Sequence, residues 1–185
     1  VAGTTGATAR DARPADVRRL LADPSPSVRA SAVRRLAGSE AADALAVVLR
    51  ALADPHPYVR TAAAGVVGQV VDPRLRRRLQ RRIERLRSPA ARAAACDAYV
   101  VWADGEGARG LRAALDDDAV QVRVAALRAV GDVLPVPDAD VLAKPLVDRD
   151  PAVRAAAIDA WVSWRRTDPL FQSRLARSDW QRLHG

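Results

Sequence analysis

The chain is short of the residue types that most often carry enzyme chemistry and metal sites. Its 185 residues include one cysteine, two histidines, no methionine, four tryptophans, two tyrosines and one phenylalanine. A single cysteine, Cys96, excludes an internal disulfide framework and fits a reducing, cytoplasmic compartment. His56 and His184 lie far apart in the sequence, so together with Cys96 they form no recognisable zinc cluster. We therefore expect no metal, no cofactor and no catalytic residues.

Long hydrophobic runs are also missing. No apolar run approaches the roughly 20 residues that a helix needs to span a bilayer. The first residues, 1–6, lack the basic-then-apolar order of a signal peptide. We expect no membrane insertion, and a disordered or extended tail over residues 1–13.

The charge of the chain is concentrated in its first half. Residues 1–92 contain 18 basic and 8 acidic residues, a net charge of +10, whereas residues 93–185 contain 12 and 14, a net charge of −2. All the basic residues except Lys144 are arginines. Hydrophobic residues make up 49% of the chain, and most of them are small. This composition favours closely packed helices.

A short sequence motif recurs along the chain with a period of 31 or 32 residues. Each copy places an arginine after a valine or an alanine, and in four copies an aspartate lies six residues before it. The arginines are Arg29, Arg60, Arg92, Arg123 and Arg154, and the aspartates are Asp23, Asp54, Asp117 and Asp148. The third copy, Ser88-Pro-Ala-Ala-Arg92, has Leu86 at the aspartate position. A fixed period of this size is typical of a solenoid, in which each unit buries its apolar face against its neighbours.

Start signals and apolar periodicity predict ten helices in five pairs, because proline and Asp-Pro are favourable at the first turn of a helix. The predicted pairs are 14–22 with 26–37, 40–53 with 57–71, 73–87 with 89–102, 105–115 with 119–133, and 138–147 with 151–165. We expect an all-α chain: a repeat array over residues 14–165 and a C-terminal capping segment over residues 166–185.

The motif, a capping Asp-Pro followed by Val-Arg-x-x-Ala, resembles HEAT-like repeats, and among them the short type named after phycobilisome lyases. The resemblance implies a right-handed α-solenoid of about five helical hairpins with a C-terminal capping helix. Such arrays serve as scaffolds, adaptors, chromophore-lyase subunits and, in one branch, DNA glycosylases. The resemblance also implies a ladder of hydrogen bonds between successive units, made by the motif aspartates and arginines. Because Leu86 replaces the third aspartate, we expect Arg92 to be paired differently and the ladder to be interrupted.

Aligning the five second helices separates a buried face from an exposed one. The buried columns are Val28, Val59, Ala91, Val122 and Val153; Ala32, Ala63, Ala95, Ala126 and Ala157; and Val33, Ala64, Cys96, Leu127 and Ile158. Trp102, Trp161 and Trp164 also fall in apolar columns, which favours core packing over base stacking. Cys96 is expected to be a buried hydrophobe, not a nucleophile.

The remaining columns should face a groove lined by the second helices, and Ala30 falls in one of them. The polar and aromatic residues of this groove give it a surface of mixed charge. Such a surface suits a protein or peptide better than a nucleic-acid duplex, since phosphates need a basic lining. The predicted partner-binding residues are Arg34, Tyr58, Asp97, Gln121, Arg128, Asp132 and Asp159.

The segment 73–87 holds eight arginines, with leucine and isoleucine at helical spacing. Five of the arginines should form a basic patch on the convex side of the solenoid: Arg74, Arg77, Arg78, Arg81 and Arg85. One interpretation is a solvated helix face, partly offset by Glu84. The other is an electrostatic contact for an acidic partner, a nucleic acid or an anionic membrane. The triplet Asp116, Asp117 and Asp118 is expected to cap the following helix and not to bind a metal.

Three function classes remain. The leading hypothesis is a non-catalytic scaffold or adaptor that binds another protein through the groove and the basic helix. The alternative is nucleic-acid binding through the face formed by residues 74–87, with or without chemistry like that of HEAT-like alkylpurine DNA glycosylases. The third is a chromophore-lyase subunit, which only the repeat subtype favours. The pattern carries no indication of an oligomeric state.

Overall fold

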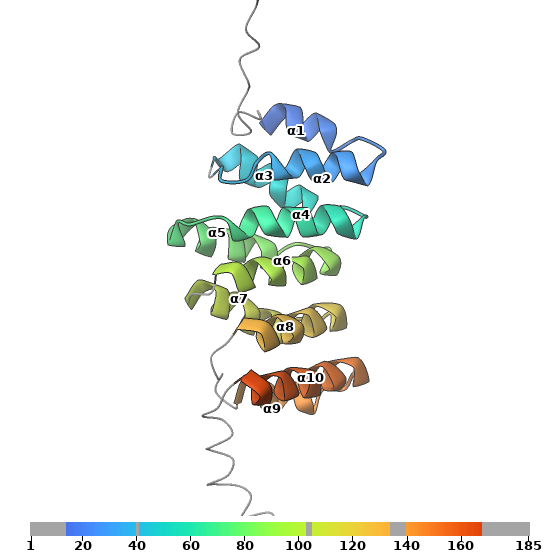
Figure 1. Ribbon diagram of the computed structural model, residues 1–185, viewed down its shortest axis with the longest axis vertical. Coiled ribbons are helices and arrows are strands. Elements are labelled where there is room, and N and C mark those ends of the chain that lie inside the picture. Colours follow the sequence, from blue (N-terminus) through green and yellow to red (C-terminus); the bar gives the residue numbers. More distant parts are fainter. Residues whose placement is uncertain (1–13, 40, 103–104, 134–139, 168–185) are drawn as a thin grey trace, which may run out of the picture.

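The computed structural model describes residues 14–39, 41–102, 105–133 and 140–167, and within them the side chains of residues 131–133, 140 and 164–167 are not described (Figure 1). The predicted tail over residues 1–13 and all but the start of the predicted capping segment therefore lie outside the described residues. The predicted groove residue Asp132 and the predicted core residue Trp164 are among the side chains that are not described.

Five helical hairpins follow one another along the described chain. The pairs are α1 (Pro14–Leu20) with α2 (Pro26–Arg34), α3 (Ala42–Ala51) with α4 (Pro57–Gly68), α5 (Pro73–Glu84) with α6 (Pro89–Trp102), α7 (Gly105–Leu115) with α8 (Val120–Val133), and α9 (Asp140–Leu146) with α10 (Pro151–Thr167). No strand occurs in the described ranges. The predicted all-α solenoid of five hairpins is confirmed.

Local sequence explains where these helices begin. Proline occupies the first turn of α2, α4 and α5, where its missing N–H group costs no hydrogen bond. The carboxylate of Asp72 caps α5 by accepting a hydrogen bond from the Arg74 amide at 2.8 Å. His56 caps α4 in the same way, because its Nδ1 accepts from the Tyr58 amide at 3.2 Å. These caps satisfy amide groups that a helix leaves without an intrahelical partner.

The second helices of the hairpins form the continuous layer of the solenoid. Helices α2, α4, α6, α8 and α10 stack in this order, each in extensive contact with the next, and the first helices lie along one side of them (Figure 1). Small residues permit this close stacking: the column of Ala32, Ala63, Ala95, Ala126 and Ala157 is buried throughout. Helix α7 approaches α6 even more closely, since a Cβ atom on Gly107 would lie 2.3 Å from the Tyr99 carbonyl oxygen.

Three of the burial predictions are wrong. Val28 is 37% exposed and Ile158 is 54% exposed, although the other members of their columns are buried. The two residues belong to the first and the last described units, and each therefore lacks one neighbouring hairpin of the described array. Ala30, predicted to face the groove, is fully buried and belongs to the hydrophobic core.

Candidate interaction surfaces

A ladder of arginine–aspartate pairs runs along one edge of the second-helix layer. Three of the five motif arginines reach forward to the aspartate of the following unit, 25 residues later, and each binds it with two parallel hydrogen bonds. The donor–acceptor distances are 2.9 and 2.9 Å for Arg29–Asp54, 2.7 and 2.8 Å for Arg92–Asp117, and 2.9 and 2.9 Å for Arg123–Asp148. This two-pronged geometry is the strongest form of the arginine–carboxylate contact.

The ladder changes the acidity of its members. Burial by itself would raise the pKa of Asp54, but hydrogen bonds from Arg29 and from the His56 amide outweigh it and lower that pKa. The pKa of Asp117 is lowered in the same way, against burial, by Arg92 and by the Ala119 amide. The carboxylates therefore stay charged and hold the turns that connect the helices of each unit.

The ladder is interrupted between the second and third units. Arg60 has no aspartate in front of it, because the third unit has Leu86 at that position, whereas Arg92 pairs normally with Asp117. The prediction that Arg92 is paired differently is therefore wrong: losing an aspartate leaves the arginine of the preceding unit without its partner. Asp23 has no such partner because its unit is the first described one, and its carboxylate accepts only from the Ser25 amide.

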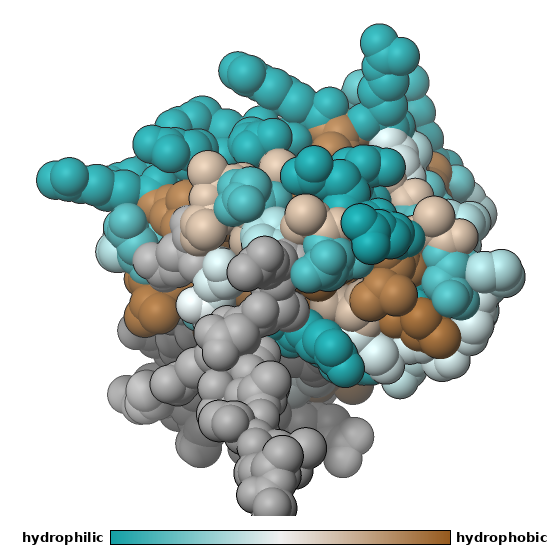
Figure 2. All heavy atoms as spheres, turned by 90° about the horizontal axis from the view of Figure 1, so that it is seen from above, coloured by the Kyte–Doolittle hydropathy of each residue, from teal (hydrophilic) through white to brown (hydrophobic). Residues whose placement is uncertain are grey.

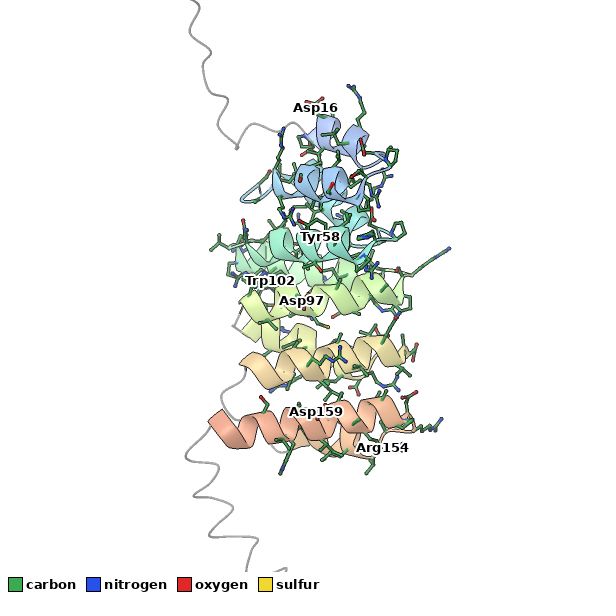
Figure 3. The ribbon with its side chains drawn as sticks, turned by 45° about the vertical axis from the view of Figure 1, so that its right-hand side comes forward. Asp16, Tyr58, Asp97, Trp102, Arg154 and Asp159 are labelled. Carbon is green, nitrogen blue, oxygen red and sulfur yellow. The ribbon has the colours of Figure 1, made fainter. Side chains whose placement is uncertain are left out.

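The predicted groove residues are spread over the exposed face of the second helices. Figure 3 shows Tyr58, Asp97 and Asp159 on α4, α6 and α10, on one side of the stack. Arg34, Gln121 and Arg128 are exposed on α2 and α8 as well. The guanidinium of Arg34 lies 4.8 Å from the centre of the Tyr58 ring, which is a cation–π contact between neighbouring units. Tyr58 is nevertheless 47% exposed, so its ring remains accessible.

An open hollow of about 700 Å³ lies on this face between α6, α8 and α10. Its lining is mostly alanine and valine, with polar groups from Gln121 and Arg128. A second hollow, of about 360 Å³, adjoins it and is lined by Asp97 and Arg128 together with small apolar residues. Burial raises the pKa of Asp97 above its ordinary value. Neither Asp97 nor Arg128 forms an ion pair with another residue of the described chain, so the groove presents charges that are not already neutralised.

Helix α5 carries the predicted basic patch, but not all of its arginines are free. Arg74, Arg78, Arg81 and Arg85 are exposed to solvent. Arg77 is 45% exposed and donates a hydrogen bond to Glu106 of α7 at 3.2 Å. Viewed along the stack from the α1 end, hydrophilic side chains project from much of the outline that is not grey, and apolar atoms appear in separate patches (Figure 2).

Two contacts in this region were missed by sequence reasoning. Glu106 is buried, at 6% exposure, and accepts hydrogen bonds from both Arg77 and Arg109. The guanidinium of Arg76 lies 5.6 Å from the centre of the Trp102 ring and donates to the Val70 carbonyl. The sequence contains no signal for the Arg77–Glu106 or the Arg76–Trp102 contact, because each joins residues on different helices at a spacing outside the repeat, whereas Arg109 lies three residues after Glu106 on α7.

Buried reactive groups are explained by packing. Trp102 is 3% exposed, and its indole N–H donates to the Val67 carbonyl at 3.1 Å, so the predicted core position is confirmed. Trp161 packs partly buried against the core. Burial, with a smaller contribution from Asp97, raises the pKa of the Cys96 thiol to about 12, and this thiol therefore stays protonated at neutral pH.

Other classes of site find no support in the described residues. They contain no group of three or more His, Cys, Asp or Glu side chains that could hold a metal ion. Within Asp116–Asp118, Asp117 belongs to the ladder, and Asp116 pairs with Lys144. No described helix is long and apolar enough to cross a membrane.

Comparison with known proteins bears on the fold. No curated protein matches the chain. Among solved structures, the X-ray structure of YibA from Escherichia coli aligns over 82% of this chain and 71% of its own, with 17% sequence identity and a TM-score of 0.35. A family model described as HEAT repeats matches residues 15–100, without distinguishing the phycobilisome-lyase type. Residues 15–100 therefore contain HEAT repeats, and the recurring Asp-Pro and Val-Arg motif and the stacked hairpins continue the same repeat pattern through α10.

Proposed function

We propose that the chain is a non-catalytic helical scaffold that binds another protein across the groove of α2, α4, α6, α8 and α10. The observation that carries this proposal is the pair of open hollows on α6, α8 and α10, where Asp97 and Arg128 stand without ion-pair partners above a floor of small apolar residues. A shallow apolar floor with a few polar groups at its edge matches the usual anatomy of a protein interface.

The composition of the groove favours a protein over a polyanion. Phosphate backbones bind to rows of basic residues, but this face alternates in charge along the stack, with Asp97 and Asp159 on either side of Arg128. Tyr58 and Arg34 supply the residue types that most often dominate binding energy at interfaces. A stable complex buries about 800 Å² per partner, an area that several adjacent second helices can provide.

Affinity capture followed by titration of the purified partner tests the groove. The groove variant combines Arg34→Gln, Asp97→Asn and Arg128→Gln. A matched control combines Arg50→Gln, Asp16→Asn and Arg112→Gln, three exposed charges on first helices with the same net change. Interface hot spots contribute at least about 2 kcal/mol each, so the groove variant should weaken binding by roughly 30-fold or more.

The control should change affinity by less than about twofold, because surface charges away from an interface contribute little. Both variants should keep the circular dichroism spectrum and the thermal midpoint of the parent chain, which separates lost binding from lost folding. Equal affinities for the groove variant and the parent would contradict the groove assignment. A similar loss in both variants would show that the effect is general electrostatics.

Nucleic-acid binding through α5 is the second candidate, favoured by the five arginines that are exposed on this helix: Arg74, Arg77, Arg78, Arg81 and Arg82. A gel-shift titration with duplex and single-stranded DNA and RNA at about 50 mM salt tests it, because phosphate contacts are strongest at low salt. Binding that falls steeply with added salt would support this candidate. No shift at about 50 mM salt would remove it.

A further inference from the structure

Every ladder arginine is oriented by its own unit before it meets the next one. In all five units the Nη1 group donates to the carbonyl six residues earlier, and in four of them also to the following carbonyl. This arrangement turns the other edge of the guanidinium, Nε with Nη2, toward the following unit. In three units this edge holds a carboxylate with two hydrogen bonds.

Arg60 has the same orientation but no carboxylate to bind. Its Nη1 donates to the carbonyls of Asp54 and Pro55, both at 2.9 Å, as in the sister units. The backbone of Leu86 also keeps the ladder register, because its carbonyl accepts from Arg92. Its side chain packs against the hydrophobic core, and the Nε–Nη2 edge of Arg60 makes no hydrogen bond with any described residue.

The surroundings of this edge match those of the occupied rungs and are more positive. In each occupied rung the carboxylate also accepts from the amide two residues after the aspartate, and Ser88 is the equivalent residue of the third unit. Arg85 and Arg87 flank Leu86 in the chain, and both are exposed. A carboxylate placed here would therefore meet an oriented guanidinium within a positively charged neighbourhood.

We propose that the Nε–Nη2 edge of Arg60, beside the turn around Leu86, is a binding site for an aspartate or glutamate side chain of a partner protein. The proposal rests on the protein-binding function above and adds a second contact, at the edge of the stack. Three rungs of the same chain show the geometry that the incoming carboxylate would adopt. The planar fork of arginine suits a planar carboxylate, and the bound group would replace the aspartate that the third unit lacks.

A labelled peptide of alternating aspartate and glycine provides the probe, with binding followed by fluorescence anisotropy at about 50 mM salt. Arg60→Gln and Arg60→Lys should each weaken binding by about tenfold or more, since lysine keeps the charge but loses the two-pronged hydrogen bond. Arg81→Gln, which removes an exposed charge on α5, should weaken it by about twofold. Equal effects at Arg60 and Arg81 would overturn the proposal in favour of unspecific attraction.

A second pair of variants leaves Arg60 and its turn contacts intact. Leu86→Asp supplies the missing ladder carboxylate within the chain and should abolish the Arg60-dependent part of binding. Leu86→Asn, which loses the same apolar contacts without adding charge, should retain that part and should melt at a lower temperature than Leu86→Asp. Equal peptide affinity of the two variants would overturn the proposal.

Two further binding measurements distinguish this carboxylate site from a phosphate site and from the groove. A labelled single-stranded oligonucleotide of the same net charge should be insensitive to Arg60→Lys, and a loss as large as that of the peptide would assign the site to phosphate. The groove variant should bind the acidic peptide as the parent does. A wrong assignment of the Arg60 site can therefore be distinguished from a wrong assignment of the groove.

Discussion

Replacing Asp117 with asparagine tests how much one rung of the ladder contributes to folding. In the native chain Arg92 binds Asp117 with hydrogen bonds of 2.7 and 2.8 Å, and the two side chains are 16% and 13% exposed. Asparagine keeps an oxygen for the Ala119 amide, but it places an NH₂ group opposite an arginine donor. Hydrogen bonds to charged groups contribute about 1.5–3 kcal/mol, whereas exposed ion pairs contribute less than about 1 kcal/mol. This mostly buried pair should therefore lose about 2 kcal/mol.

Urea unfolding followed by circular dichroism measures the loss, provided that the slope of the transition is unchanged. A double-mutant cycle with Arg92→Met should give a coupling energy of about 1–2 kcal/mol. Asp118→Asn is the matched control, because it removes the same charge from an exposed neighbour and should cost less than about 0.5 kcal/mol. A coupling near zero, or an equal effect of Asp118→Asn, would refute the reasoning that the rung stabilises the array.

Two further predictions concern packing and pH. Gly107→Ala should destabilise the chain by several kcal/mol in urea unfolding, because its Cβ atom would lie 2.3 Å from the backbone oxygen of Tyr99. Gly65→Ala, with no atom within 4 Å of its Cβ, should instead stabilise the chain by about 0.5–1 kcal/mol. The reverse order of stabilities would contradict the close approach of α6 and α7. The pKa values of Asp117 and Asp148 are lowered in the folded chain. Their contribution to the free energy of unfolding is therefore complete above the pKa of the unfolded chain, about 3.9, and is lost as the pH falls through the pKa values of the folded chain. Thermal midpoints should therefore be flat from about pH 7 to pH 5 and fall below about pH 4, and a fall centred near pH 6.5 would indicate a histidine instead.

Helix positions could be predicted from the sequence because the signals are local and repeat. Proline and capping residues begin the helices at the predicted places: α6 was expected over residues 89–102 and spans Pro89–Trp102. The C-terminal ends were less accurate. The second helix of the first unit was expected to reach residue 37, but α2 ends at Arg34, and the chain turns at Gly38, whose φ is +78°. A positive φ is accessible to glycine, and here it turns the chain after the helix has ended.

Contacts between helices could be predicted only where the repeat itself encodes them. The pairing of ladder arginines with aspartates follows from the recurring motif, but its direction, forward to the next unit, does not. That missing direction placed the interruption at Arg92 instead of Arg60. The Arg34–Tyr58 contact and the Arg77–Glu106 pair depend on the rotation of individual helices, which spacing in the sequence does not define.

The interface between the second and third units shows how the array tolerates a missing rung. Arg60 lies near the beginning of α4, where the ladder bond is absent. Near the end of the same helix, the indole of Trp102 donates to the Val67 carbonyl, and Arg76 donates to the Val70 carbonyl. These bonds join the same two units, and the Arg76 guanidinium lies over the Trp102 ring. Since hydrogen bonds hold this interface at its other end, the stack does not depend on a ladder bond at Arg60.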